Sequence, residues 1–159
     1  HRDARRRGLR EVGGNAEVMR LVAAGLCDFG WTDTDDFFAA RDEGNPVELL
    51  PVAVDMAPAS ASGDGEVILI PNSVAIIRGT QRLADAQRLV EYLLSEKTEL
   101  ALARSSSRQI PLGPIVSAEP QLPDDVRELA TLVPRGYDLN RLGSARRECL
   151  DWLKSEYGP

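Results

Sequence analysis

An acidic turn directly after an apolar run carries the most evident chemistry of this sequence. Residues 26–31 are largely apolar, Thr32 follows them, and three aspartates come within the next four positions, at Asp33, Asp35 and Asp36. Carboxylate oxygens are hard ligands that suit hard cations. Like charges about 4 Å apart repel by roughly 4 kcal/mol near a protein surface. The three carboxylates therefore need screening by water, or a cationic or hydrogen-bonding partner.

A helix cap is the alternative role for the same residues. Thr32 or Asp33 can cap a helix that begins here, and Asp35 or Asp36, three residues on, can close a capping box. Each carboxylate in the first turn gains roughly 0.3–1 kcal/mol from the helix dipole. That gain accounts for one aspartate and is smaller than the repulsion among three. Capping and ligand binding both stay open at this point.

A glycine turn precedes the acidic turn and opens another helix. Gly13-Gly14-Asn15 leads into apolar residues at three- and four-residue spacing, and Gly25 stands where a helix end favours positive φ. Ligands of open α/β sheets bind at the carboxyl ends of strands, beside helix N-termini. We therefore expect the glycine turn and the acidic turn to line one crevice.

Composition narrows the class of protein. The chain has 159 residues, a net charge of −6 and 43% hydrophobic residues, which fits a soluble globular protein and argues against a nucleic-acid partner. Its single histidine, His1, excludes a Ser-His or Cys-His catalytic arrangement within the chain, and no Cys/His metal spacing occurs. Cys27 and Cys149 are expected to be buried thiols, with a disulfide as the alternative. No signal segment is evident, and the charged opening suggests a part of a longer protein.

Periodicity and turn residues predict an α/β fold with a short central sheet and a mainly helical C-terminal part. The chain divides into a ligand-facing α/β segment (1–55), a flexible loop at 56–65 followed by interlobe strands (to residue 81), and a helical region (82–159). So short a sheet leaves an open edge, through which the isolated chain is expected to self-associate. Strands are expected at 9–12, 26–31, 47–54, 66–70 and 73–77; helices are expected at 3–8, from Asn15, from the acidic turn to Asp42, over 83–104 with a restart at Ser95, from Asp124, and from a cap at Ser144.

Four pieces of the sequence, in this order and spacing, resemble one family. They are GNAEVMRLVAAGLCDFGWTDTDD, PVELLPV, ILIPNSVAII and ADAQRLVEYLLSEKTELALARSSSRQIPL. Together they resemble the C-terminal half of an extracellular solute-binding protein of an ABC importer, of the ferric-iron-binding type. The resemblance covers most of residues 1–113 and is looser beyond them.

The resemblance implies a type 2 periplasmic-binding fold, in which two lobes close over a solute, and an extracytoplasmic protein that delivers it to a membrane permease. It implies that Asn15 and Asp33 hold an anion bound with the metal, and that Asp35 and Asp36 replace the tyrosine pair that coordinates iron in the family. No enzymatic activity and no resident cofactor are expected; Fe³⁺ or another metal is the cargo. The expected ligand-binding residues are Gly14, Asn15, Ala16, Thr32, Asp33 and Thr34, and the expected metal ligands are Asp35 and Asp36.

Other functions remain as alternatives. The same receptor can take an organic or phosphorylated anion. Asp33-Thr34-Asp35 after an apolar run is similar to the motif of Mg²⁺-dependent haloacid-dehalogenase-like phosphatases, although Phe37 stands where that motif has a small or branched residue. Residues 105–108 form either an anion cradle or a polar linker. Trp31 is expected in the core, with stacking on a ligand as the alternative.

Overall fold

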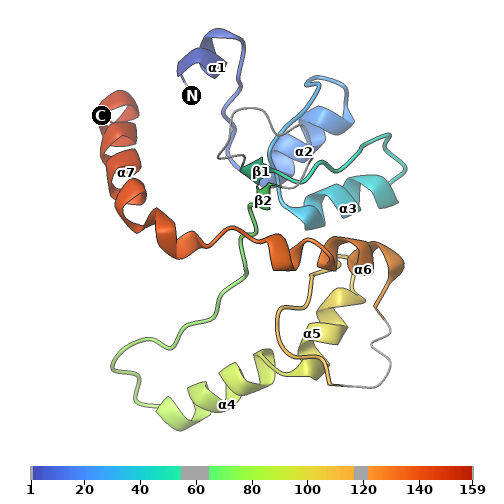
Figure 1. Ribbon diagram of the computed structural model, residues 1–159, viewed down its shortest axis with the longest axis vertical. Helices are drawn as coiled ribbons and strands as arrows, with labels where there is room; N and C mark the ends of the chain where they lie inside the picture. The colour runs from blue at the N-terminus through green and yellow to red at the C-terminus, as the bar shows by residue number, and fades with distance from the viewer. Residues whose placement is uncertain (1, 55–64, 117–121, 159) are drawn as a thin grey trace. The chain divides into compact units, whose positions relative to one another are not determined.

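A computed structural model describes residues 2–54, 65–116 and 122–158, and this part of the chain is mainly helical (Figure 1). The only regular strands among these residues are two short ones. The helices are α1 (Arg2–Arg6), α2 (Asn15–Ala23), α3 (Thr34–Asp42), α4 (Leu83–Leu93), α5 (Glu96–Ala103), α6 (Asp124–Ala130) and α7 (Gly143–Tyr157), with 3₁₀ turns η1 (Val133–Arg135) and η2 (Leu139–Leu142); the strands are β1 (Ala53–Val54) and β2 (Glu66–Val67). None of the described helices has the length and apolar character needed to cross a membrane.

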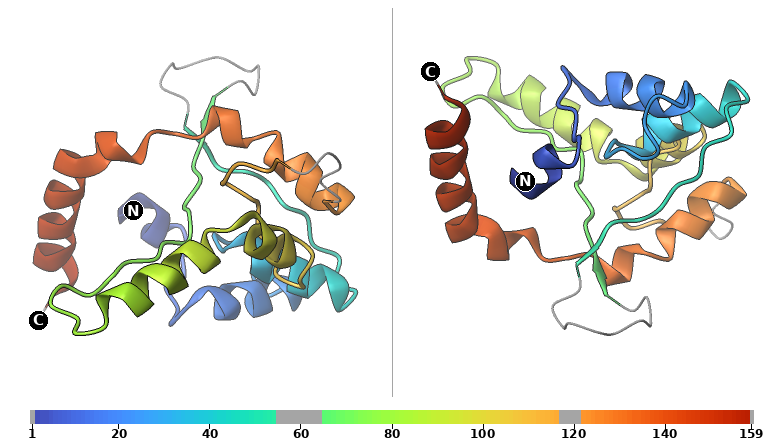
Figure 2. Two further views of the ribbon diagram at one scale, coloured as in Figure 1. Left: turned by 90° about the horizontal axis from the view of Figure 1, so that it is seen from below. Right: turned by 90° about the horizontal axis from the view of Figure 1, so that it is seen from above.

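The expected central sheet is reduced to two short strands among the described residues. β1 and β2 pair antiparallel, with Ala53 opposite Val67, and an isolated bridge joins Val67 to Gly136. Residues 9–12, 26–31 and 73–77 lie in no strand, and residues 43–52 run as irregular chain between α3 and β1 (Figure 2). A β-branched sequence becomes a strand only within a ladder of hydrogen bonds to a neighbouring strand, and these segments belong to no such ladder among the described residues.

The helices follow the sequence pattern closely, because their signals are local. α2, α3 and α6 begin where expected, and α5 begins after Ser95, whose hydroxyl accepts a hydrogen bond from the Thr98 amide. Gly25 has φ of +68°, as expected for a residue that ends a helix. The expected cap at Ser144 is wrong, since α7 already begins at Gly143.

The described chain forms two compact units. One contains the residues up to Leu50 together with Asn72–Thr131, and the other contains Pro51–Pro71 together with Leu132–Pro159. This division differs from the three consecutive parts expected from the sequence. Residues 55–64, which make up most of the loop expected at 56–65, lie outside the described residues.

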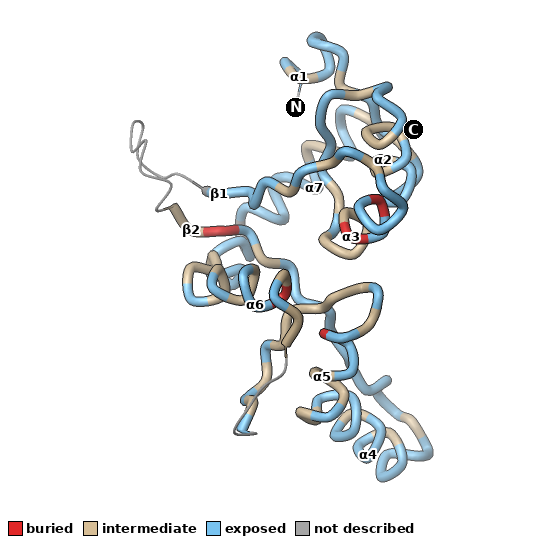
Figure 3. The backbone as a smooth tube through the Cα atoms, turned by 90° about the vertical axis from the view of Figure 1, so that its right-hand side faces the viewer, coloured by how far each residue is buried: buried red, intermediate tan, exposed pale blue. Residues whose placement is uncertain are grey.

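Buried side chains are few in the described chain and lie mostly on α3, α5 and α6 (Figure 3). In the first unit Phe38 and Val126 are the largest of them, at 1% and 0% exposure. Trp31 is 59% exposed, so its expected place in the core is wrong; its ring meets that of Phe29 edge-on at 5.9 Å. The buried residues are Phe38, Ala40, Ala103 and Val126 in the first unit and Val67 in the second.

Both cysteines are free thiols. Cys27 is half-buried and Cys149 is exposed on α7, so the expectation of two buried thiols is wrong for Cys149. The apolar spacing of a helix gives a buried face only where another element covers it.

Gly30 allows the chain between α2 and α3 to approach α2 closely. A Cβ atom at this position would overlap Val18 Cγ1 and lie 3.2 Å from Val22 Cγ2. The absence of that atom lets residues 26–31 cross the face of α2, and α2 and α3 then pack on each other. The start of α3 is thereby brought to the start of α2.

Gly30→Ala is therefore expected to lower the free energy of unfolding by about 1–3 kcal/mol, the usual cost of overpacking. Chemical denaturation measures it. Gly113→Ala is the matched control in the same unit, because its Cβ would meet nothing closer than Glu99 Oε1 at 3.6 Å. Equal stability of the Gly30→Ala variant and the wild type would show that the close approach is not required.

Candidate acidic site at the starts of α2 and α3

The glycine turn and the acidic turn meet in the structure, as expected from the sequence. The side-chain amide of Asn15, the first residue of α2, donates a hydrogen bond to Asp33 Oδ2. The Thr32 hydroxyl oxygen lies 3.2 Å from the Asn15 carbonyl oxygen, although its one hydrogen serves the shorter contact to Asp36. These two contacts join residues 17 and 18 positions apart in the chain and fix the start of α3 beside the start of α2.

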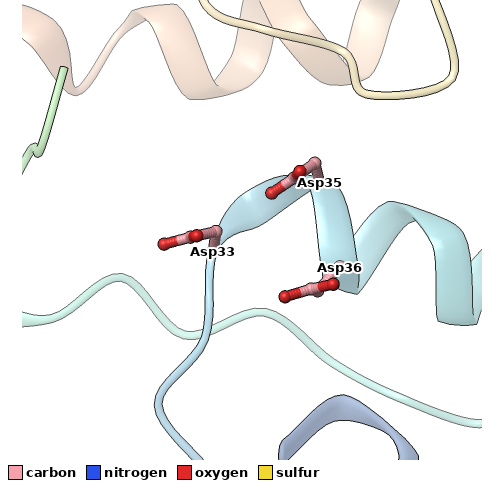
Figure 4. A group of neighbouring side chains, drawn as sticks. All are labelled: Asp33, Asp35 and Asp36. Atoms are coloured by element: carbon pink, nitrogen blue, oxygen red, sulfur yellow. The ribbon is translucent and has the colours of Figure 1, made fainter. Parts of the chain in front are cut away.

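Three carboxylates gather at this junction. Asp33, Asp35 and Asp36 each offer one oxygen, and the three oxygens lie within 4.8 Å of one another (Figure 4). Asp33 is exposed, and the other two are half-buried. Asp36 Oδ2 accepts a hydrogen bond of 2.6 Å from the Thr32 hydroxyl. Asn15 and Thr32 thus each hold one carboxylate, as outer groups orient the ligands of metal sites.

The expected capping box is not formed. Asp33 occupies the N-cap position of α3 with extended backbone, but its side chain makes no hydrogen bond to the helix amides. Its carboxylate accepts from Asn15 instead. At the start of α2, the carboxylate of Glu17 accepts from the Gly13 amide at 3.1 Å. Capping therefore does not account for the acidic turn.

The electrostatic balance of the junction favours a cation. Each helix N-terminus carries roughly half a positive charge. The two termini together therefore offset about one of the three carboxylate charges and leave a local charge of about −2. Closely spaced carboxylate oxygens with this balance suit a hard cation, and they oppose a bound anion.

The other three expected ligand residues, Gly14, Ala16 and Thr34, lie at the junction but add no side-chain hydrogen bond to it. Gly14 is the N-cap residue of α2 and has no side chain to offer, and Ala16 follows Asn15 in the first turn. Thr34 is the first residue of α3. None of the three donates a side-chain hydrogen bond to the Asn15–Asp33 contact. Gly30, which permits the contact, was not identified from the sequence, although a glycine inside an apolar run is a signal of close approach.

The turn at residues 105–108 uses several of its backbone amides within itself. The Ser107 amide donates to the Ser105 hydroxyl at 3.3 Å, and the Arg108 amide donates to the Ser105 carbonyl at 3.1 Å. The next amide, of Gln109, donates to the Leu102 carbonyl. These donors are used within the turn, so they are not directed at a ligand. Arg108 forms ion pairs with Asp42 and Asp125.

The Asn15–Asp33 contact predicts an energetic coupling. Asn15→Ala removes a donor to a charged group at an exposed position, and we expect it to lower the unfolding free energy by about 1 kcal/mol. In the Asp33→Ala background the same substitution is expected to cost almost nothing, which a double-mutant cycle measures. Equal costs in both backgrounds would contradict the contact.

The Arg108–Asp42 pair predicts a dependence on pH. Hydrogen bonds donated by Arg108 hold the pKa of Asp42 below its usual 3.8. A carboxylate with a depressed folded-state pKa stabilises the fold above its unfolded-state pKa, and the contribution is lost as pH falls through the folded-state value. At pH 6 the wild type should therefore have a higher free energy of unfolding in urea than Asp42→Asn. The difference should shrink as pH falls below 3.8. A pH-independent difference would show that the charge of Asp42 is not responsible.

Comparison with protein-family models, with curated proteins and with solved structures gives no match for this chain. The similarity to iron-type solute-binding proteins therefore stays a prediction from the sequence.

Proposed function

We propose that this chain belongs to the solute-binding component of an ABC importer, and that its acidic site binds a hard metal cation as cargo. The observation that carries the proposal is the meeting of Asp33, Asp35 and Asp36, whose oxygens lie within 4.8 Å of one another. Fe³⁺ is the cargo that the sequence resemblance favours. No catalytic step is part of this function.

The choice of a cation over an anion rests on charge and on the hydrogen-bond donors. The junction keeps a local charge of about −2 after the helix termini are counted. Two side-chain donors at the junction, the Asn15 amide and the Thr32 hydroxyl, already bind Asp33 and Asp36. An organic or phosphorylated anion is therefore the weaker candidate.

The proposal includes an α/β lobe of the periplasmic-binding type. Residues 47–54, 66–70 and 73–77 would serve as its strands. Ile70 and Ile77 are 80% and 82% exposed, and β-branched residues of this kind are most often buried in folded proteins. Pairing of these segments with other polypeptide in the receptor would cover them. Such a receptor acts outside the cytoplasm and delivers its cargo to a membrane permease.

Terbium luminescence tests the site directly, because Tb³⁺ is a hard trivalent cation whose emission a nearby tryptophan sensitises. Trp31 lies two residues before Asp33, and the only other tryptophan is Trp152. We expect saturable emission that Trp31→Phe abolishes and that Fe³⁺, supplied as a soluble chelate, competes away.

Asp35→Ala with Asp36→Ala is expected to weaken Tb³⁺ binding by tenfold or more, since it removes two of the three carboxylates. Asp28→Ala with Asp85→Ala is the control, because it removes the same charge at exposed positions outside the cluster. Equal losses in the two double variants would mean that the ion responds to overall charge. No loss in the first would show that the acidic turn does not bind the metal.

A further inference from the structure

A second charged cluster lies at the opposite end of α3 from the acidic turn. The Arg108 guanidinium binds both carboxylate oxygens of Asp42, the last residue of α3, at 2.7 and 3.1 Å. Its Nε atom lies 3.0 Å from Asp125 Oδ2, on α6. One side chain therefore joins three segments: α3, the turn after α5, and α6.

Arg41 and Phe38 complete this arrangement, which we name the Arg108 cluster (Phe38, Arg41, Asp42, Arg108 and Asp125). Arg41 pairs with Asp125 at 2.6 Å. The guanidinium carbons of Arg41 and Arg108 each lie 4.9 Å from the centroid of the Phe38 ring, which is almost fully buried. Stacking of this kind adds to the ion pairs.

The Arg108 cluster is better shielded than the other ion pairs of the first unit. The side chains of Arg108 and Asp125 are 20% and 23% exposed. Those of Arg88 and Asp85 on α4 are 75% and 63% exposed, and such surface pairs contribute little. The forked contact to Asp42 is also the strong geometry for an arginine–carboxylate pair.

The backbone of Arg108 is held in an unfavourable conformation. Its φ of +44° makes it the one non-glycine residue with positive φ in the described part of the chain. Such a conformation costs on the order of 1 kcal/mol and persists where surrounding contacts impose it. The contacts that impose it here include the ion pairs to Asp42 and Asp125. Loss of those pairs would allow the turn to relax.

α6 depends on contacts outside itself. It has seven residues, and a helix this short is not stable in water by itself. Val126 is its one buried residue, and Asp125 pairs with Arg41 on α3 and with Arg108 in the turn. The α2–α3 pair, by contrast, has its own packing and the Asn15–Asp33 contact.

We propose that the Arg108 cluster is a strap that holds α6 and the turn at residues 105–108 against α3. Its release detaches α6 as a local unit while α2 and α3 stay folded. This device is independent of the proposed metal site, which lies at the first turn of α3.

Hydrogen exchange followed by mass spectrometry on the full chain tests the strap. Arg108→Gly removes the side chain and keeps a residue that accepts positive φ, so the effect comes from the lost ion pairs and the lost stacking on Phe38. We expect amide exchange in residues 122–131 to rise roughly tenfold or more, with α2 and the first turn of α3 unchanged.

Arg88→Ala, which removes the exposed ion pair on α4, is the control and should leave α6 unchanged. Asp125→Asn is a second, milder variant, because it keeps the Arg108–Asp42 pair. It should also accelerate amide exchange in α6 and leave exchange in α2 and α3 unchanged. Unchanged α6 exchange in Arg108→Gly, or in Asp125→Asn if Arg108→Gly does not fold, would overturn the proposal. Equally faster amide exchange in α2, α3 and α6 would also overturn the proposal, because the cluster would then stabilise the whole unit.

Discussion

The hydrogen bond from the Asn15 side chain to the Asp33 carboxylate joins the starts of α2 and α3. It is possible only because Gly30 lets the connecting chain pass close to Val18 and Val22. A polar contact at the surface is worth little by itself. Its importance here lies in where it places the acidic turn, which is beside the N-termini of both α2 and α3.

Two charged groups at opposite ends of one nine-residue helix give α3 a double role. Its start carries Asp33, Asp35 and Asp36, for which the described residues show no cationic partner; Asn15 holds Asp33 and Thr32 holds Asp36. Its last residues carry Arg41 and Asp42, whose charges are matched by Asp125 and Arg108. Unmatched charge suits the capture of a cation, and matched charge suits the attachment of neighbouring segments.

The sequence predicted the helices well and the sheet poorly, for a physical reason. Helix signals such as the Ser95 cap and the Gly25 end are local, whereas a strand such as 73–77 exists only with a partner. The sequence predicted that the two turns lie together, but it did so from a strand at residues 26–31 that is not formed. It did not predict Asn15 as the partner of Asp33, or an arginine paired with an aspartate 66 residues away. Such pairings depend on how the chain folds back on itself.

Nuclear Overhauser effects from the Asn15 side-chain amide test the central contact most directly. In the isotopically labelled chain, cross-peaks from the Asn15 Nδ2 protons to the Asp33 Cβ protons and to the Thr32 side chain are expected, together with sequential cross-peaks along α2 and α3. If both helices give their sequential cross-peaks and those from Asn15 to Thr32 and Asp33 are absent, the two turns do not meet. The acidic site as described would then not exist.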